Sequence, residues 1–169
     1  MKSLFLMIPL LLLLAGCEKK ESVGGDGPSR IFAVGCNPVE ETSANSGRFD
    51  MDEDIVFSGD DIEWFNAETR EVKFKEAFSP YSIPMYKEIR FELSGEVLFS
   101  AMTFATDINS QIFNDLVLYY SMQRKKYYLN DSYPAHIFTE QARINKENRA
   151  VAWARFLEQL KSEGKLRRK

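Results

Sequence analysis

Side chains that could act as nucleophiles or general bases are few in this 169-residue chain, which contains two cysteines and a single histidine. A catalytic triad needs a base that contacts a nucleophile and is oriented by a carboxylate. His136 follows Pro134 closely, and no G-x-S-x-G sequence presents a serine to it. We therefore expect no catalytic residue of this kind, and we interpret His136 as an ordinary surface or hinge residue.

The first cysteine, Cys17, ends an N-terminal segment with the three parts of a secretory signal. Lys2 supplies a positive charge, thirteen uncharged residues follow from Leu4 to Gly16, and small residues precede the cysteine. A membrane-spanning helix needs roughly 20 apolar residues, so this stretch is too short to span. The sequence predicts a signal peptide over residues 1–16.

The four residues Leu14-Ala15-Gly16-Cys17 resemble the lipobox of bacterial lipoproteins. In that family the cysteine is acylated on its sulfur and becomes the first residue after cleavage. The resemblance implies that Cys17 carries two or three acyl chains, such as palmitate, which hold a protein on a membrane almost permanently. Glu18 after the cysteine, by resemblance to lipoprotein sorting rules, implies the outer membrane or the cell surface.

The segment after Cys17 is rich in glycine and polar residues, which predicts a flexible tether over residues 17–29 with the lipidated cysteine at its start. Residues 30–169 have the length of a single globular domain. The formal net charge of the chain is −3. Because nucleic acids are bound by basic surfaces, this charge argues against a nucleic acid partner.

No metal or cofactor is expected. Cys36 is the only cysteine left for the mature domain, so neither an internal disulfide nor a tetrahedral cysteine zinc site can form, and we expect its side chain to be buried. Asp50, Asp52 and Asp54 have the spacing that opens an EF-hand loop. The loop fails because Ile55 stands where glycine is required and Asp61 where a bidentate glutamate is usual.

From Arg30 to Pro134 the apolar residues mostly recur with a period of two, which is typical of β-strands. Three hairpins are predicted, over residues 62–75, 87–105 and 116–130. Weaker strands are expected at residues 31–34 and 55–57, and one or two helical turns after Asp107.

Beyond Pro134 the period changes to that of a helix. An apolar stripe recurs at i, i+3, i+4 and i+7, formed by Trp153, Phe156, Leu157 and Leu160. Asn145 is a suitable N-cap, although the helix could begin as early as Thr139, and Gly164 is a natural stop. The expected fold class is α+β, an antiparallel sheet built from hairpins with one C-terminal helix packed on it. The basic residues 165–169 are interpreted as a frayed tail.

Tyrosines are the strongest candidates for binding a partner. Tyr81 and Tyr86 belong to an apolar loop over residues 78–86, which either covers the open end of the core or presents a contact surface. Tyr119 and Tyr127 each belong to an adjacent tyrosine pair on the third hairpin, so one tyrosine of each strand should be exposed. We predict these four residues as candidate partner-binding residues.

Two functions remain compatible with the sequence. The first is a membrane-anchored envelope lipoprotein that serves as a non-enzymatic binding or accessory module for a protein or glycan partner. The second is a small hydrolase whose carboxylates converge in a cleft, since any two acids can meet at the required distance. The domain is also similar to small lipoproteins of unknown function from gut-dwelling diderm bacteria, through "GDDIEWFN", "YYLNDSYP" and the Trp153 helix, a resemblance that implies no activity.

Overall fold

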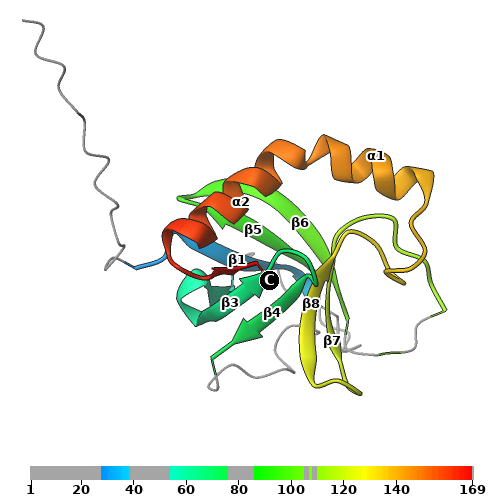
Figure 1. Cartoon of the computed structure of the whole chain (residues 1–169), viewed down its shortest axis with the longest axis horizontal. Helices are drawn as coiled ribbons and strands as arrows, with labels where there is room; N and C mark the ends of the chain where they lie inside the picture. Colours follow the sequence, from blue (N-terminus) through cyan, green and yellow to red (C-terminus); the bar gives the residue numbers. More distant parts are fainter. Residues whose placement is uncertain (1–27, 39–53, 76–85, 105–106, 108–109, 169) are drawn as a thin grey trace, which may run out of the picture.

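The computed structural model describes residues 28–38, 54–75, 86–104, 107 and 110–168. The described residues form a curled nine-stranded sheet and two helices, which lie along one side of the sheet (Figure 1). The predicted signal peptide, Cys17, nearly all of the predicted tether, residues 50–53 and the loop with Tyr81 lie outside the described residues. The elements are β1 Ile31–Pro38, β2 Ile55–Ser58, the 3₁₀ turn η1 Gly59–Asp61, β3 Ile62–Asn66, β4 Glu71–Phe74, β5 Tyr86–Leu93, β6 Glu96–Phe104, β7 Val117–Ser121, β8 Lys126–Asn130, α1 Glu140–Asn148, α2 Ala150–Ser162 and β9 Leu166–Arg167.

The three predicted hairpins are confirmed. They correspond to the antiparallel pairs β3–β4, β5–β6 and β7–β8, and the two weaker strands are β1 and β2. Alternation on β5 places Ile89 and Phe91 in the core while the charged residues between them stay partly exposed. The period of two thus identified both the strands and their buried face.

The sheet is mixed, which corrects the expectation of a purely antiparallel sheet. The strand order is β2-β1-β5-β6-β7-β8-β4-β3-β9, and the pairs β6–β7 and β3–β9 are parallel. The strands β6 and β7 are joined by a crossover that brings the chain back to run in the same direction. The strand β9 has only two residues, so it has no period that a sequence pattern could reveal.

The sheet curls so strongly that its edge strand β2 meets β4. The rings of Phe57 and Phe74 lie 4.8 Å apart in an edge-to-face contact, although their strands are not neighbours in the sheet. The apolar core fills the inside of this curl, and α2 closes it with Phe156 and Leu160, which are almost completely buried. Edge-to-face contacts of this kind add to the stabilisation that burial alone provides.

Two helices replace the single predicted one. Thr139 caps α1 by accepting a hydrogen bond from the amide of Ala142, so the early start is correct and Asn145 is not the N-cap. The chain leaves helical geometry at Arg149, whose ψ is 5°. The buried side chain of Arg149 is held by carboxylates of two other segments, which accounts for a bend that helix propensity does not reveal.

The helical turns expected after Asp107 are wrong for the described residues of that stretch. Residues 110–112 have no regular structure, and Phe113 forms an antiparallel bridge with Tyr133. Asp107 uses its backbone carbonyl to accept a hydrogen bond from the Tyr133 hydroxyl, at 3.0 Å. Local capping chemistry was therefore a poor guide, because the segment is fixed by a contact that is distant in sequence.

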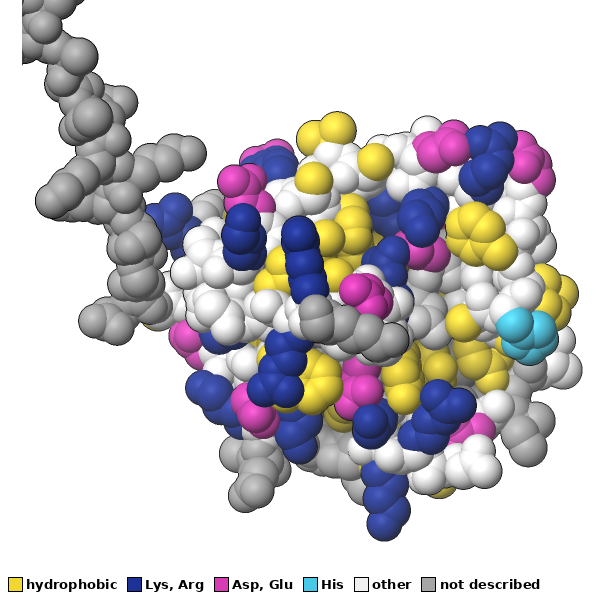
Figure 2. All heavy atoms as spheres, in the orientation of Figure 1, with side chains coloured by type: hydrophobic (Ala, Val, Ile, Leu, Met, Phe, Trp, Pro, Cys, Tyr) yellow, Lys and Arg dark blue, Asp and Glu magenta, His cyan; other side chains and the backbone are white. Residues whose placement is uncertain are grey.

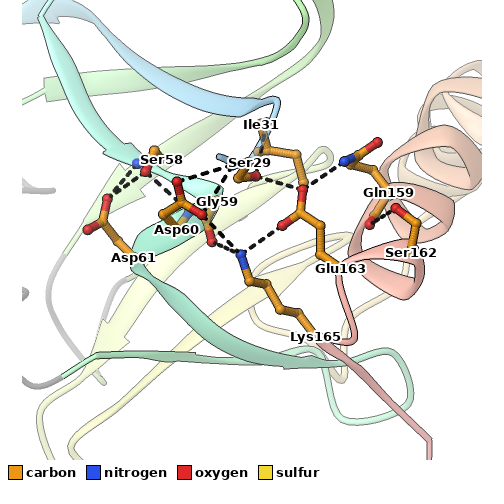
Figure 3. Close-up of polar contacts among 10 residues, drawn as sticks. All are labelled: Ser29, Ile31, Ser58, Gly59, Asp60, Asp61, Gln159, Ser162, Glu163 and Lys165. Atoms are coloured by element: carbon orange, nitrogen blue, oxygen red, sulfur yellow. Dashed lines mark hydrogen bonds and ion pairs between the residues drawn. The ribbon is translucent and has the colours of Figure 1, made fainter. Parts of the chain in front are cut away.

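The N-terminal latch, defined here as Ser29, Gly59, Asp60, Glu163 and Lys165, joins the start and the end of the domain (Figure 3). The Ser29 hydroxyl donates to Glu163 at 2.7 Å, and the Ser29 amide donates to Asp60 at 3.1 Å. Lys165 donates to the Gly59 carbonyl at 2.8 Å and to Glu163 at 2.7 Å.

The latch corrects two expectations. Ser29, the last residue assigned to the tether, is 5% exposed and belongs to the fold. The basic tail is not frayed up to Arg167, because Leu166 and Arg167 form β9 and pair in parallel with β3. Lys165 has exchanged water for three oxygen partners in the latch, which explains how its charged ammonium group can lie partly buried there.

Cys36 lies in β1 as a free, half-buried cysteine, so the expectation of a fully buried side chain is met only in part. Its thiol donates to the carbonyl of Val34 at 3.7 Å. Neither described helix is long and apolar enough to cross a bilayer.

Candidate functional site

The structure does not bring the predicted tyrosines together on one surface. Tyr81 lies outside the described residues. Tyr86 begins β5, where its ring packs against Gly35 and its hydroxyl donates to Asp54 at 3.0 Å. Burial and this hydrogen bond raise the pKa of Tyr86. Tyr86 is therefore a packing residue between β1 and β5.

The third hairpin packs its tyrosines on both of its faces, with the two of β8 buried and the two of β7 half-buried. Tyr119 stacks on Tyr128 at 5.4 Å between ring centroids, and Tyr133 packs edge-on against the pair on the face away from the main core. Tyr127, on the core face, is 7% exposed and contacts Phe74. The expectation of one exposed tyrosine on each strand is thus wrong, because both tyrosines of β8 are buried and both tyrosines of β7 are half-buried.

The largest group of buried charges surrounds Asp131, next to the bend between the helices. Arg149 and Asp131 are 9% and 11% exposed and form an ion pair at 2.8 Å. Arg70 and Lys146 also contact Asp131, at 2.5 and 3.0 Å, and Arg149 reaches Asp115 as well. We name these five residues the Asp131 network.

The Asp131 network is built for stability. Burial alone would raise the pKa of Asp131, but the hydrogen bond from Arg149 and the charges of Arg70 and Lys146 outweigh it and hold the pKa below its ordinary value. The guanidinium of Arg70 also lies 4.3 Å from the ring of Trp153. The network therefore joins the β3–β4 turn, the end of β8 and both helices. Its charged groups form ion pairs with one another.

A different arrangement lies between the β3–β4 and β7–β8 hairpins, which are held side by side by the pairing of β4 with β8. Here the surface is hollowed into a pocket of about 480 Å³, within the range of small-molecule binding sites. We name it the hairpin pocket. Its described lining residues are Trp64, Glu71, Val72, Lys73, Phe74, Lys75, Tyr120, Arg124, Lys125, Lys126 and Tyr127.

Aromatic rings form the inner part of the hairpin pocket. Tyr120 and Tyr127 face each other across β7 and β8 with ring centroids 4.9 Å apart. Trp64 is half-buried, and the guanidinium of Arg167 lies 4.4 Å from its ring. Burial, followed by the charge of neighbouring Tyr120, raises the pKa of Tyr127 well above its ordinary value. The Tyr127 hydroxyl is therefore neutral near pH 7.

Positive charges surround these rings. Lys73, Lys75, Arg124, Lys125 and Lys126 line the pocket, whereas Glu71 is the one carboxylate among its described lining residues. Lys126 contacts Glu71 at 3.0 Å, and this pair joins β8 to β4. The carboxylate of Glu71 is thereby occupied, and no second described carboxylate lines the pocket to complete an acid and base pair.

Of the predicted site residues that the structure describes, only Tyr127 lines the hairpin pocket, and His136 lies exposed in the loop before α1. Sequence reasoning missed Trp64 and the lysines, because the pocket depends on the contact between β4 and β8, which are far apart in the chain. A usable signal was the basic character of both strand ends, "VKFK" and "QRKK". Among the described residues, no group of three or more histidine, cysteine or acidic side chains could hold a metal ion.

Comparison with known proteins gives no match for this chain among family models, curated proteins or solved structures. The function is therefore inferred from the fold and the hairpin pocket.

Proposed function

We propose that this protein is a membrane-anchored envelope lipoprotein and a non-enzymatic binding module whose hairpin pocket contacts a glycan partner. The observation that carries the proposal is the pocket, whose described lining places aromatic rings beside several cations and includes one carboxylate, which is already paired. Aromatic side chains provide large contact areas at low entropic cost, and polar groups around them fix the orientation of a ligand.

The lipobox resemblance at Leu14-Ala15-Gly16-Cys17 supports a membrane anchor through a lipid on Cys17. Converting Cys17 to serine removes the sulfur to which a lipid would be attached, so the protein should appear in a soluble or unprocessed form when cell fractions are probed. Unchanged retention on the membrane in this variant would contradict the anchor. Mass spectrometry of the native product should find acyl mass on the first residue, and an intact leader would overturn the assignment.

Binding is tested with a glycan array and the purified full-length protein. Trp64→Ala should weaken binding to any glycan identified by at least about tenfold, because it removes an aromatic wall of the pocket. Phe138→Ala is the matched control, since Phe138 is an exposed aromatic residue that does not line the pocket. Thermal melts establish that both variants are folded, and Trp64→Phe should restore most of the affinity.

A small hydrolase is the alternative class. Glycoside hydrolysis needs two carboxyl groups separated by roughly 5 to 10 Å, and the described lining of the hairpin pocket supplies Glu71 alone. The binding module therefore fits the pocket better. Cleavage of glycosides by the wild-type protein, lost in Glu71→Gln, would replace the binding proposal with the hydrolase.

A further inference from the structure

The charge of the hairpin pocket differs in sign from that of the whole protein. Its described lining residues include five cations and one carboxylate, in a chain whose formal net charge is −3. Figure 2 shows several Lys and Arg side chains in the lower half of the view, where the β3–β4 and β7–β8 hairpins lie in Figure 1, besides others in the upper half. A positive hollow on an otherwise acidic protein attracts a negatively charged ligand to one place.

Most of these cations are available to a ligand. Lys73, Lys75 and Lys125 are exposed and form no ion pair within the described part of the chain. Lys73 lies directly across the β3–β4 pair from Trp64, so a free ammonium group and an aromatic ring share one wall of the pocket. Lys125 is in the turn of the third hairpin, with a φ of 54°, and extends the positive surface toward the opposite wall.

The kind of cation indicates the kind of anion. Four of the five are lysines, whose ammonium group is a compact point charge on a flexible stem. A single phosphate or carboxylate held in fixed geometry is better recognised by the fork of an arginine. Several separate lysines, spread over two hairpins, suit negative charges that are distributed along a chain.

Taking the proposed function as its basis, we infer that the hairpin pocket binds an acidic polysaccharide, a sugar polymer that carries carboxylate or sulfate groups at intervals. The half-exposed rings of Trp64 and Tyr120 contact the apolar faces of the sugars, while Lys73, Lys75 and Lys125 neutralise successive acidic groups. Aromatic residues thus bind the sugar rings, and lysines of the same pocket bind the acidic groups.

The experiment compares alginate oligosaccharides with neutral dextran oligosaccharides of equal length, binding to the full-length protein in a neutral detergent. Alginate should bind at least about tenfold more tightly at low salt, and raising the ionic strength from about 0.05 to about 0.5 M should remove most of that difference because exposed charges are then screened. Lys73→Gln/Lys75→Gln should weaken alginate binding about tenfold and leave dextran binding unchanged. Lys87→Gln/Lys161→Gln, the control of equal charge outside the pocket, should change neither by more than about twofold.

The outcomes separate the inference from the function on which it rests. Equal binding of both sugars, weakened in both by Trp64→Ala, would keep the glycan-binding module and overturn the acidic ligand. Binding of neither sugar would contradict the proposed function as well. Tighter binding of single-stranded DNA than of alginate, lost in Lys73→Gln/Lys75→Gln, would show that the pocket selects nucleic acid and would overturn the inference.

Discussion

The Asp131 network and the hairpin pocket both concentrate positive side chains, but they do so in opposite ways. Around Asp131, three cations share two carboxylates, and the central pair is about nine-tenths buried. Among the described residues that line the hairpin pocket, five cations share one carboxylate, and these cations are exposed. Buried charges must pair with one another, because an unpaired buried charge destabilises the fold. Exposed charges without a partner can bind a ligand with little loss of folding stability. The comparison predicts that mutations will affect stability in the first region and binding in the second.

The largest effect on stability is expected from Asp131→Asn. Removing this charge leaves Arg149 and Arg70 buried without their main partner, which should lower the free energy of unfolding by about 3 to 5 kcal/mol. Denaturation in urea measures the loss. Asp115→Asn is the matched control and should cost less than about 1 kcal/mol, because Asp115 is more than half exposed. Equal losses in the two variants would mean that burial does not distinguish these ion pairs.

A smaller loss is expected in the latch. A Cβ atom at position 59 would overlap the hydroxyl of Ser29, so Gly59→Ala should cost about 2 kcal/mol as Ser29 is displaced. Ser29→Gly removes the atoms that the new methyl group would meet. The loss of stability in the double variant should therefore be smaller than the sum of the losses in the two single variants, by at least about 0.5 kcal/mol in a double-mutant cycle. Simple additivity would show that the two residues do not share a contact.

The pH dependence of stability should come from the same paired regions. Burial would raise the pKa of Glu163, but hydrogen bonds from Gln159, Lys165 and Ser29 outweigh it and lower the pKa, as the partners of Asp131 do in the network. A carboxyl group whose pKa is lowered in the folded state stabilises the fold fully at pH values above its ordinary pKa, which is 4.5 for Glu163. This stabilisation is lost as the pH falls through the pKa of the folded state. Stability should therefore be constant near neutral pH and fall below about pH 5. Glu163→Gln should flatten this profile in melts recorded from pH 7 to pH 3, and an unchanged profile would contradict the assignment.

The smallest effect on stability is expected in the hairpin pocket. Lys73→Gln/Lys75→Gln should change the free energy of unfolding by no more than about 0.5 kcal/mol, because both side chains are exposed and form no ion pair with the residues that the structure describes. The same urea titration used for Asp131→Asn measures it. A loss of more than about 1 kcal/mol would place these lysines among the stabilising charges and remove the contrast between the two regions.

Local patterns were sufficient to predict most of the elements. The alternation of Ile89, Phe91 and Leu93 and the stripe that contains Phe156 and Leu160 follow from the geometry of a strand and a helix, so they are visible without knowledge of the fold. Gly164, with a φ of 70°, ends α2 as predicted, because a residue without a side chain adopts this conformation freely.

Features that depend on contacts distant in sequence were not predictable. The parallel pairing of β6 with β7, the strand β9 and the bend at Arg149 each require knowledge of a partner that lies elsewhere in the chain. The hairpin pocket is of the same kind, since Lys73 and Lys125 belong to different hairpins that only the β4–β8 pairing brings together. Tyrosine pairs in the sequence drew attention to the third hairpin, where Tyr119 and Tyr128 stack on each other and Tyr120 and Tyr127 line the pocket.

The latch also determines how the domain would respond to mechanical tension. A pull applied through the residues before Ser29 would first load the hydrogen bonds to Asp60 and Glu163. It would then load β1, which is flanked by β2 and β5 and is hydrogen-bonded along both of its edges. Because β1 must separate from both β2 and β5 at once, the domain would resist unfolding under a force applied through its N-terminal end.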